Sequence, residues 1–125
     1  MLNCGDTFLI GTDEDAEDLH LQIITTPPKE GEVVTVCVVS AHKRSERSVV
    51  LNEGDHEFIT HESVIEFKWS KIRYVTDIEA AIANGGAKTR APIAPEILKK
   101  AQNWLVESDF TPNGVRHYFK EVMGL

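Results

Sequence analysis

The sequence has no apolar run long enough to cross a membrane, and it contains little cysteine. Its longest apolar stretch, residues 33–39, is interrupted by Thr35 and is far shorter than the ~20 residues of a transmembrane helix. The first residues lack the basic segment and apolar core of a signal peptide, so we expect a cytoplasmic protein that does not contact a membrane. Cys4 and Cys37 are then expected to be thiols. The sequence contains no Cys-x-x-Cys motif, the spacing that would indicate a structural zinc site.

The sequence also has fewer basic than acidic residues. The chain has 13 Lys and Arg against 20 Asp and Glu, which gives a formal net charge of −7. Such a charge repels phosphates and disfavours broad, nonspecific binding to nucleic acid. The charges are unevenly placed, however, with an acidic run at residues 13–18 and a small basic run at residues 42–47. A local basic groove therefore remains compatible with an RNA substrate.

The remaining composition and the hydrophobic patterns predict a single α+β domain. The 42% hydrophobic and 26% charged residues are typical of a globular protein. Patterns of strands dominate up to about residue 78, and helical patterns follow. We expect strands at residues 6–10, 19–25, 32–40, 48–51, 64–67 and 72–75. We expect helices at residues 77–84, 95–106 and 115–123, with residues 87–94 as a connection. This order favours a small, strongly curved antiparallel sheet with helices added at its C-terminal end.

Two of the five histidines lie in a polar segment between two expected strands, residues 51–63. Loops on a rigid sheet often carry functional groups, and histidine is the side chain best suited to proton transfer near neutral pH. His56 and His61 are therefore candidate site residues. A hairpin loop whose polar groups cap its own backbone accounts for the same residues equally well.

Short motifs follow one another in the strand-rich part of the chain. They are Gly5-Asp6 at the first strand, His20 at the second, Ser40 at the end of the third, and the segments 63–67 and 71–77. Together these motifs, over roughly residues 4–84, resemble the PemK/MazF family of toxins, which are small SH3-like barrels that cleave RNA. The family usually has Arg-Pro where this chain has His20-Leu21, and a Pro before the residue that corresponds to Ser40.

The resemblance implies an SH3-like barrel with a short helix over residues 1–84, and a helical extension of the same domain over residues 85–125. It also implies a toxin that is a metal-independent endoribonuclease without a cofactor. A homodimer and a partner antitoxin are further expectations from this resemblance.

Metal-free cleavage of RNA needs a base, an acid and donors around the phosphate. The resemblance places His20 where the family has its catalytic Arg, and Ser40 where it has Thr or Ser. His61 and His56 are the next candidates for proton transfer. The residues expected to bind the substrate are Lys43, Arg44, Arg47 and Ser63.

Two other interpretations of the sequence stay open. His56 and His61, with Asp55, Glu57 or Glu62, are a possible set of ligands for a divalent metal ion, although their spacing fixes no geometry outside a helix. Alternatively, the chain is a non-catalytic SH3-like module that binds a protein partner through its acidic run and through Trp69 or Trp104. An enzyme requires the candidate histidines and Ser40 to meet in one place, whereas a binding module does not.

Overall fold

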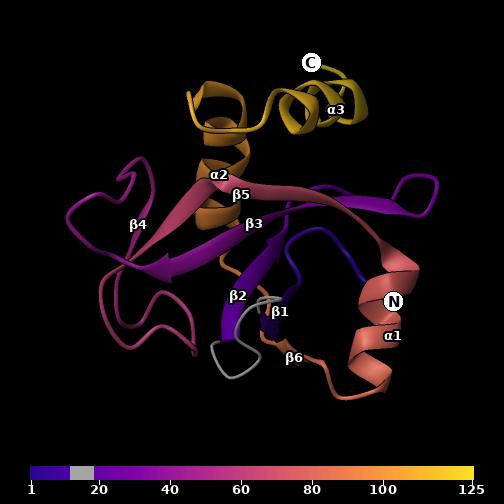
Figure 1. Cartoon of the computed structure of the whole chain (residues 1–125), viewed down its shortest axis with the longest axis horizontal. Coiled ribbons are helices and arrows are strands. Elements are labelled where there is room, and N and C mark those ends of the chain that lie inside the picture. Colours follow the sequence, from indigo (N-terminus) through magenta and orange to yellow (C-terminus); the bar gives the residue numbers. More distant parts are fainter. Residues whose placement is uncertain (12–18) are drawn as a thin grey trace.

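The computed structural model describes residues 1–11 and 19–125, so the acidic run at residues 13–18 lies outside the described residues. Within this part of the chain, six strands form one antiparallel sheet, and three helices pack against it (Figure 1). The sheet curls into an open half-barrel. The expected α+β class, with a curved antiparallel sheet and helices towards the C-terminus, is therefore confirmed.

The sheet places the most apolar strand in its interior. The strands are β1 (Thr7–Gly11), β2 (Leu19–Ile24), β3 (Glu32–Ser40), β4 (Val50–Leu51), β5 (Ser63–Tyr74) and β6 (Ala87–Arg90). Their order across the sheet is β4-β5-β3-β2-β1-β6, and neighbouring strands are antiparallel. Strand β3 lies between β5 and β2, and its β-branched run is buried on both faces, as the sequence predicts for a central strand.

Strand β5 is one strand of 12 residues, so the prediction of two separate strands at residues 64–67 and 72–75 is wrong. The polar residues between them suggested a break, but they form an irregularity within the strand. Thr35 pairs with Lys71 and Cys37 pairs with Glu66. Only Val36 of β3 thus lies opposite residues 67–70 of β5. Such a bulge bends the strand and increases its twist, which helps to curl the sheet.

Residues 87–90 form strand β6 at the edge of the sheet, where the sequence predicts only a connection. Ala87 is buried, but the next three residues are polar and exposed. The segment therefore lacks the β-branched or aromatic pattern that indicates a strand. Short, polar strands are common at sheet edges, where they discourage pairing with other chains. Since β6 pairs with β1, part of the segment 85–125 completes the sheet.

The helices are α1 (Val75–Ala83), α2 (Pro95–Glu107) and α3 (Asn113–Met123). Pro95 lies in the first turn of α2, and Gly124 ends α3 in a left-handed conformation. Helix α1 begins directly after β5, two residues earlier than expected. None of the helices in the described part of the chain is long and apolar enough to span a membrane.

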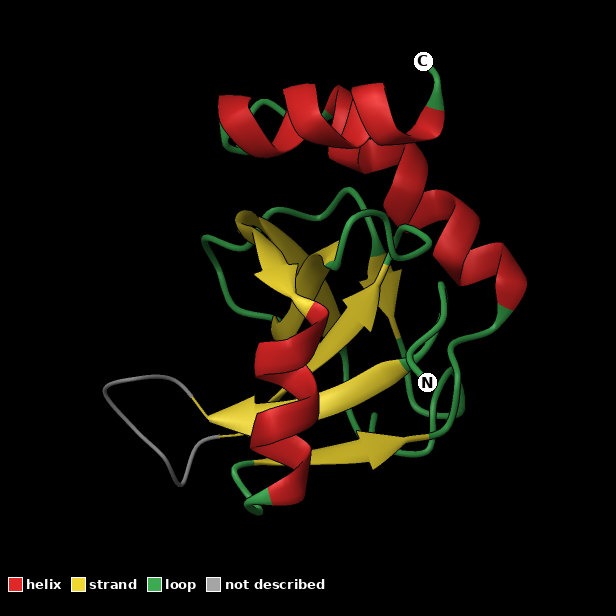
Figure 2. Ribbon diagram, turned by 90° about the vertical axis from the view of Figure 1, so that its right-hand side faces the viewer, coloured by secondary structure: helices red, strands yellow, loops and turns green. Residues whose placement is uncertain are grey.

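Each face of the sheet has its own apolar core, because side chains alternate between the faces along a strand. On one face, α2 and α3 pack through Ala101, Leu105 and Phe119. On the other, α1 packs through Ile78 against residues that include Phe8 of β1. Figure 2 shows α2 and α3 together, with α1 apart from them against the sheet. We call the second surface the α1 face.

Candidate functional site

The end of β3 and the end of the histidine-containing loop meet at one side of the sheet. Ser40, the last residue of β3, pairs with Ser63, the first residue of β5. This register places His61, two residues before Ser63, beside Ser40. Ser40 Oγ lies 2.7 Å from His61 Nε2, and both side chains are exposed. The structure thus brings together two of the residues that the sequence predicts as catalytic.

Several hydrogen bonds hold His61 in place. The hydroxyl of Ser63, which is buried, donates to the carbonyl of His61 at 3.0 Å. The backbone N–H of Ala41 donates to the carbonyl of Glu62 at 3.1 Å. Thr60 Oγ1 lies 3.3 Å from His61 Nδ1, so each ring nitrogen has a hydroxyl neighbour. Ser63, expected to bind substrate, here supports the loop that carries His61. Thr60 was not singled out from the sequence, because an isolated threonine in a loop gives no signal.

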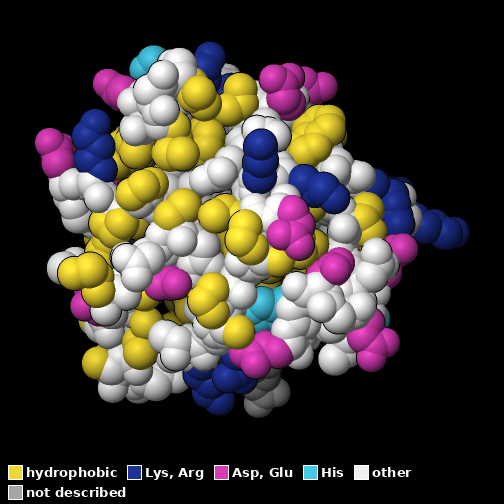
Figure 3. Space-filling model, turned by 180° about the vertical axis from the view of Figure 1, so that it is seen from behind, with side chains coloured by type: hydrophobic (Ala, Val, Ile, Leu, Met, Phe, Trp, Pro, Cys, Tyr) yellow, Lys and Arg dark blue, Asp and Glu magenta, His cyan; other side chains and the backbone are white. Residues whose placement is uncertain are grey.

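Positively charged side chains follow Ser40 in the loop that joins β3 to β4. Arg47 Nη2 lies 2.6 Å from Glu62 Oε1, which places its guanidinium beside the residue next to His61. Lys43 and Arg44 are exposed in the same loop. This loop lies at the left in Figure 1 and therefore at the right in Figure 3, which is seen from behind. Lys and Arg side chains protrude at that edge in Figure 3. The Ser40–His61 pair therefore lies beside the Arg47–Glu62 ion pair and a loop with two further exposed cationic side chains.

His56 belongs to the same loop but has a different environment. Its side chain is only 6% exposed. Its Nδ1 accepts the backbone N–H of Phe58 at 3.0 Å, so the proton of the neutral ring is on Nε2. Nε2 lies 2.6 Å from the carbonyl of Ala91 and 3.3 Å from Thr7 Oγ1. These contacts join the loop to β1 and to the residue after β6, which gives His56 a structural role.

His20 lies on β2 and is half-buried, opposite Ile10 of β1. Its side chain and that of Ser40 point to different faces of the sheet. Leu21 pairs with Val38, and paired residues share a face. Ser40, two residues from Val38, is on that face, whereas His20, next to Leu21, is on the α1 face. Of the four candidate catalytic residues, the structure therefore brings together Ser40 and His61.

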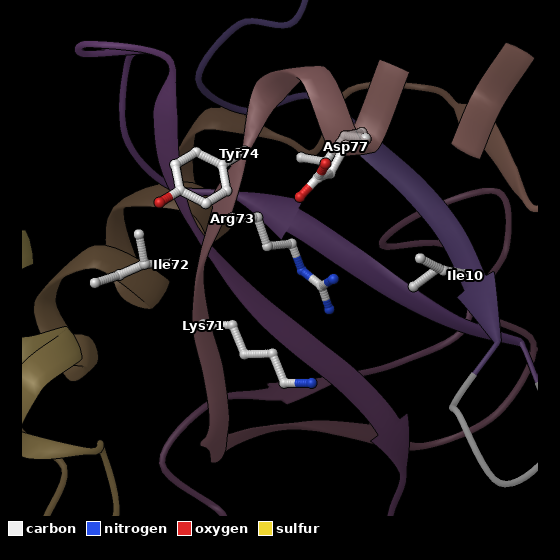
Figure 4. Close-up of a pocket in the computed structure, with 7 residues that line it drawn as sticks. Ile10, Lys71, Ile72, Arg73, Tyr74 and Asp77 are labelled. Carbon is white, nitrogen blue, oxygen red and sulfur yellow. The ribbon is translucent and has the colours of Figure 1, made fainter. Parts of the chain in front are cut away.

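A second group of polar side chains lies on the α1 face and was not expected from the sequence. A pocket of about 360 Å³ is lined by Ile10, Lys71, Ile72, Arg73, Tyr74, Asp77 and Ile78 (Figure 4). The alternation of Lys71 and Arg73 along β5 is the signal that would have indicated it, since residues two apart on a strand share a face.

The thiol of Cys37 also lies on the α1 face, between Gln22 of β2 and Glu66 of β5. Burial raises the pKa of this thiol, while the hydrogen bond with Gln22 lowers it less. A buried, protonated thiol is a poor nucleophile. Cys37 is therefore a core residue, in agreement with its apolar sequence context.

Neither the search for a metal site nor the comparison with known proteins assigns a function to the chain. Within residues 1–11 and 19–125, no group of three or more His, Cys, Asp or Glu side chains is arranged to hold a metal ion. A comparison with the models of known protein families and with curated protein sequences finds no match.

Proposed function

We propose that this protein is a toxin-like, metal-independent endoribonuclease with an SH3-like barrel and a cleavage site at Ser40 and His61. The observation that supports this proposal is the 2.7 Å contact between the Ser40 hydroxyl and the His61 ring, exposed beside the basic β3–β4 loop. The motifs that resemble the PemK/MazF family point to the same activity. They add the proposals of a homodimer, a partner antitoxin and action in the cytoplasm.

The arrangement suits transfer of a proton from the 2′-hydroxyl of RNA. His61 Nε2 takes this proton, and the 2′-oxygen attacks the adjacent phosphorus atom. The bond from phosphorus to the 5′-oxygen breaks, and this oxygen takes a proton from water. The products are a 2′,3′-cyclic phosphate and a 5′-hydroxyl end. Ser40 donates a hydrogen bond to a phosphate oxygen, and Arg47 stabilises the negative charge that develops there.

The neighbours of His61 favour phosphate chemistry over a serine nucleophile. In a Ser-His-Asp triad, a buried carboxylate accepts a hydrogen bond from Nδ1–H and stabilises the charged ring. Here the neighbour of Nδ1 is the hydroxyl of Thr60 at 3.3 Å, so a hydroxyl stands where the triad has its carboxylate. The nearby cation Arg47 and the exposed Lys43 and Arg44 match a phosphate substrate better than an ester or amide.

The proposal is tested by cleavage of single-stranded RNA in the presence of a chelator. We expect the wild type to produce 2′,3′-cyclic phosphate ends. Loss of the proton acceptor in His61→Ala is expected to reduce the rate by about 100-fold or more. His117→Ala removes an exposed histidine on α3 and is the matched control. Equal rates for His61→Ala and His117→Ala would contradict the proposal.

Induced expression extends the same test to cells. We expect growth arrest and fragmented RNA with the wild type and with His117→Ala, but not with His61→Ala. Normal growth and intact RNA in all three strains would remove the support for a toxin.

The alternative function is a non-catalytic SH3-like module that binds a protein partner. Exposed aromatic side chains favour it, since Trp69 is 53% and Phe110 is 60% exposed, and aromatic residues often dominate protein interfaces. This alternative predicts no cleavage of RNA. It also predicts that a captured partner is lost with Trp69→Ala and retained with His61→Ala.

A further inference from the structure

The pocket on the α1 face is separate from the Ser40–His61 pair. Its two cationic residues lie in the second half of β5, whereas the pair lies at the start of that strand. Lys71 follows Ser63 by eight positions, which corresponds to roughly 25 Å of extended chain. The volume of about 360 Å³ lies in the range of roughly 300–1,000 Å³ that is usual for small-molecule sites. One nucleotide unit is a suitable size for this space.

Lys71 and Arg73 place two positive charges side by side in this pocket. They project from β5 in the same direction, towards Ile10 (Figure 4). Arg73 Nε donates to Thr35 Oγ1 at 3.0 Å, and Thr35 is fully buried in β3. The core of the sheet thus sets the orientation of the guanidinium group. Two neighbouring cations, one of them preoriented, suit a phosphate group.

The other groups that line the pocket indicate what the phosphate is attached to. Asp77, in the first turn of α1, presents a carboxylate to the same space. A carboxylate repels free phosphate but accepts a hydrogen bond from a hydroxyl group. Ile10 and Ile78 provide an apolar wall that suits the carbon atoms of a sugar. A ligand with a phosphate, a hydroxyl donor and an apolar ring edge satisfies all of these groups.

We propose that this pocket binds one ribose-phosphate unit of single-stranded RNA. Lys71 and Arg73 hold the phosphate, and Asp77 accepts a hydrogen bond from the 2′-hydroxyl. This hydroxyl is the group by which a protein distinguishes RNA from DNA. The inference rests on the proposed function, because it describes how the RNA substrate is anchored away from the site of cleavage.

The first test measures the affinity of the full chain for a labelled single-stranded RNA of about ten nucleotides, a usual length for such sites. His61→Ala is the background, so that the RNA stays intact. We expect Lys71→Gln to weaken the binding of RNA and of DNA alike, by about fivefold. The slope of the logarithm of the binding constant against the logarithm of the salt concentration is expected to become smaller by about 1. Lys99→Gln, at an exposed lysine on α2, removes the same charge and is expected to have no effect.

A second variant tests the role of the hydroxyl. We expect Asp77→Ala to weaken binding of RNA but not of DNA with the same base order, because DNA lacks the 2′-hydroxyl. Loss of an acidic residue alone strengthens the binding of both polymers. Glu79→Ala, at an exposed position of α1, controls for that change in charge.

Three results would overturn the inference: equal binding by Lys71→Gln and Lys99→Gln, an unchanged RNA preference in Asp77→Ala, or no RNA binding in the His61→Ala background. Thermal unfolding of each variant establishes that it is folded. Cleavage is measured separately with the wild type. Cleavage without an effect of Lys71→Gln on binding refutes only the pocket. An effect of Lys71→Gln on binding without cleavage refutes only the proposed enzymatic function.

Discussion

Two histidines of one loop are expected to differ sharply in their effect on stability. The ring of His56 is buried and accepts the N–H of Phe58 through Nδ1, while Nε2 donates to the carbonyl of Ala91. The ring of His61 is exposed and contacts the hydroxyls of Ser40 and Thr60. We predict that His56→Ala destabilises the fold and that His61→Ala does not.

The contacts of His56 set the magnitude of the effect. The change removes two hydrogen bonds to the backbone, each worth about 1 kcal/mol. Loss of a buried ring leaves a partial cavity, which adds about 1 kcal/mol. The free energy of unfolding is therefore expected to fall by about 3 kcal/mol in His56→Ala. For a chain of this size, the midpoint of thermal unfolding falls by roughly 10 °C. For His61→Ala, as for most exposed positions, we expect a change within about 0.5 kcal/mol.

Urea titrations of the wild type and both variants, followed by circular dichroism, give the free energies directly. His117→Ala provides a further exposed position for comparison. If His56→Ala matches the wild type, the hydrogen bonds to Phe58 and Ala91 do not stabilise the loop. If His61→Ala loses as much as His56→Ala, His61 is itself structural, and any loss of RNA cleavage in that variant no longer identifies a proton acceptor.

Three other substitutions test the core. Burial raises the pKa of the Cys37 thiol in the folded protein. As the pH rises above the usual thiol pKa of about 8.5, the unfolded chain therefore loses this proton before the folded protein does, and the wild type loses stability. Urea titrations from neutral pH to above pH ~9 should show a smaller loss of stability in Cys37→Ala than in the wild type. Glu66 is 5% exposed, and its Oε1 has no hydrogen-bond partner among residues 1–11 and 19–125. Glu66→Gln is therefore expected to raise the free energy of unfolding by about 1 kcal/mol, and a decrease in urea titrations would contradict this. Gly5 has φ of +93° and an added Cβ would lie 3.5 Å from Leu98, so Gly5→Ala should cost about 1 kcal/mol through backbone strain rather than collision, which thermal unfolding measures.

The elements that the sequence predicts well are those whose apolar residues are regularly spaced. Strand β3 and helices α2 and α3 have such patterns, and each was placed within a few residues. Strand β6 has none, because an edge strand with exposed side chains needs only backbone pairing with β1. The polar residues 68–71 hid the continuity of β5 for a related reason. At a bulge the alternation of side chains is interrupted, and the local pattern is that of a loop.

The candidate site was predictable by residue type but not by position. Ser40 and His61 were each selected from the sequence, but their contact depends on the pairing of Ser40 with Ser63. A shift of that register by one residue moves a side chain to the other face of the sheet. The same alternation of side chains places His20 and Ser40 on opposite faces, although His20 lies near the start of β2 and Ser40 at the end of the neighbouring strand β3. Motif order along the chain carries no information about the face.

The net charge of the chain is a poor guide to its proposed substrate, because cationic side chains lie at each of the two proposed contact sites. Arg47 contacts Glu62 just before β5 begins, and Lys71 and Arg73 lie near its end. RNA that reaches from the Ser40–His61 pair to the pocket passes from one face of the sheet to the other and contacts these cations directly, while the net charge of −7 acts mainly at longer range, where salt screens it. Affinity for RNA should therefore depend on these few residues more than on total charge. Removing Lys71 and removing Lys99 change the total charge equally, so the difference between these two variants measures the local contribution.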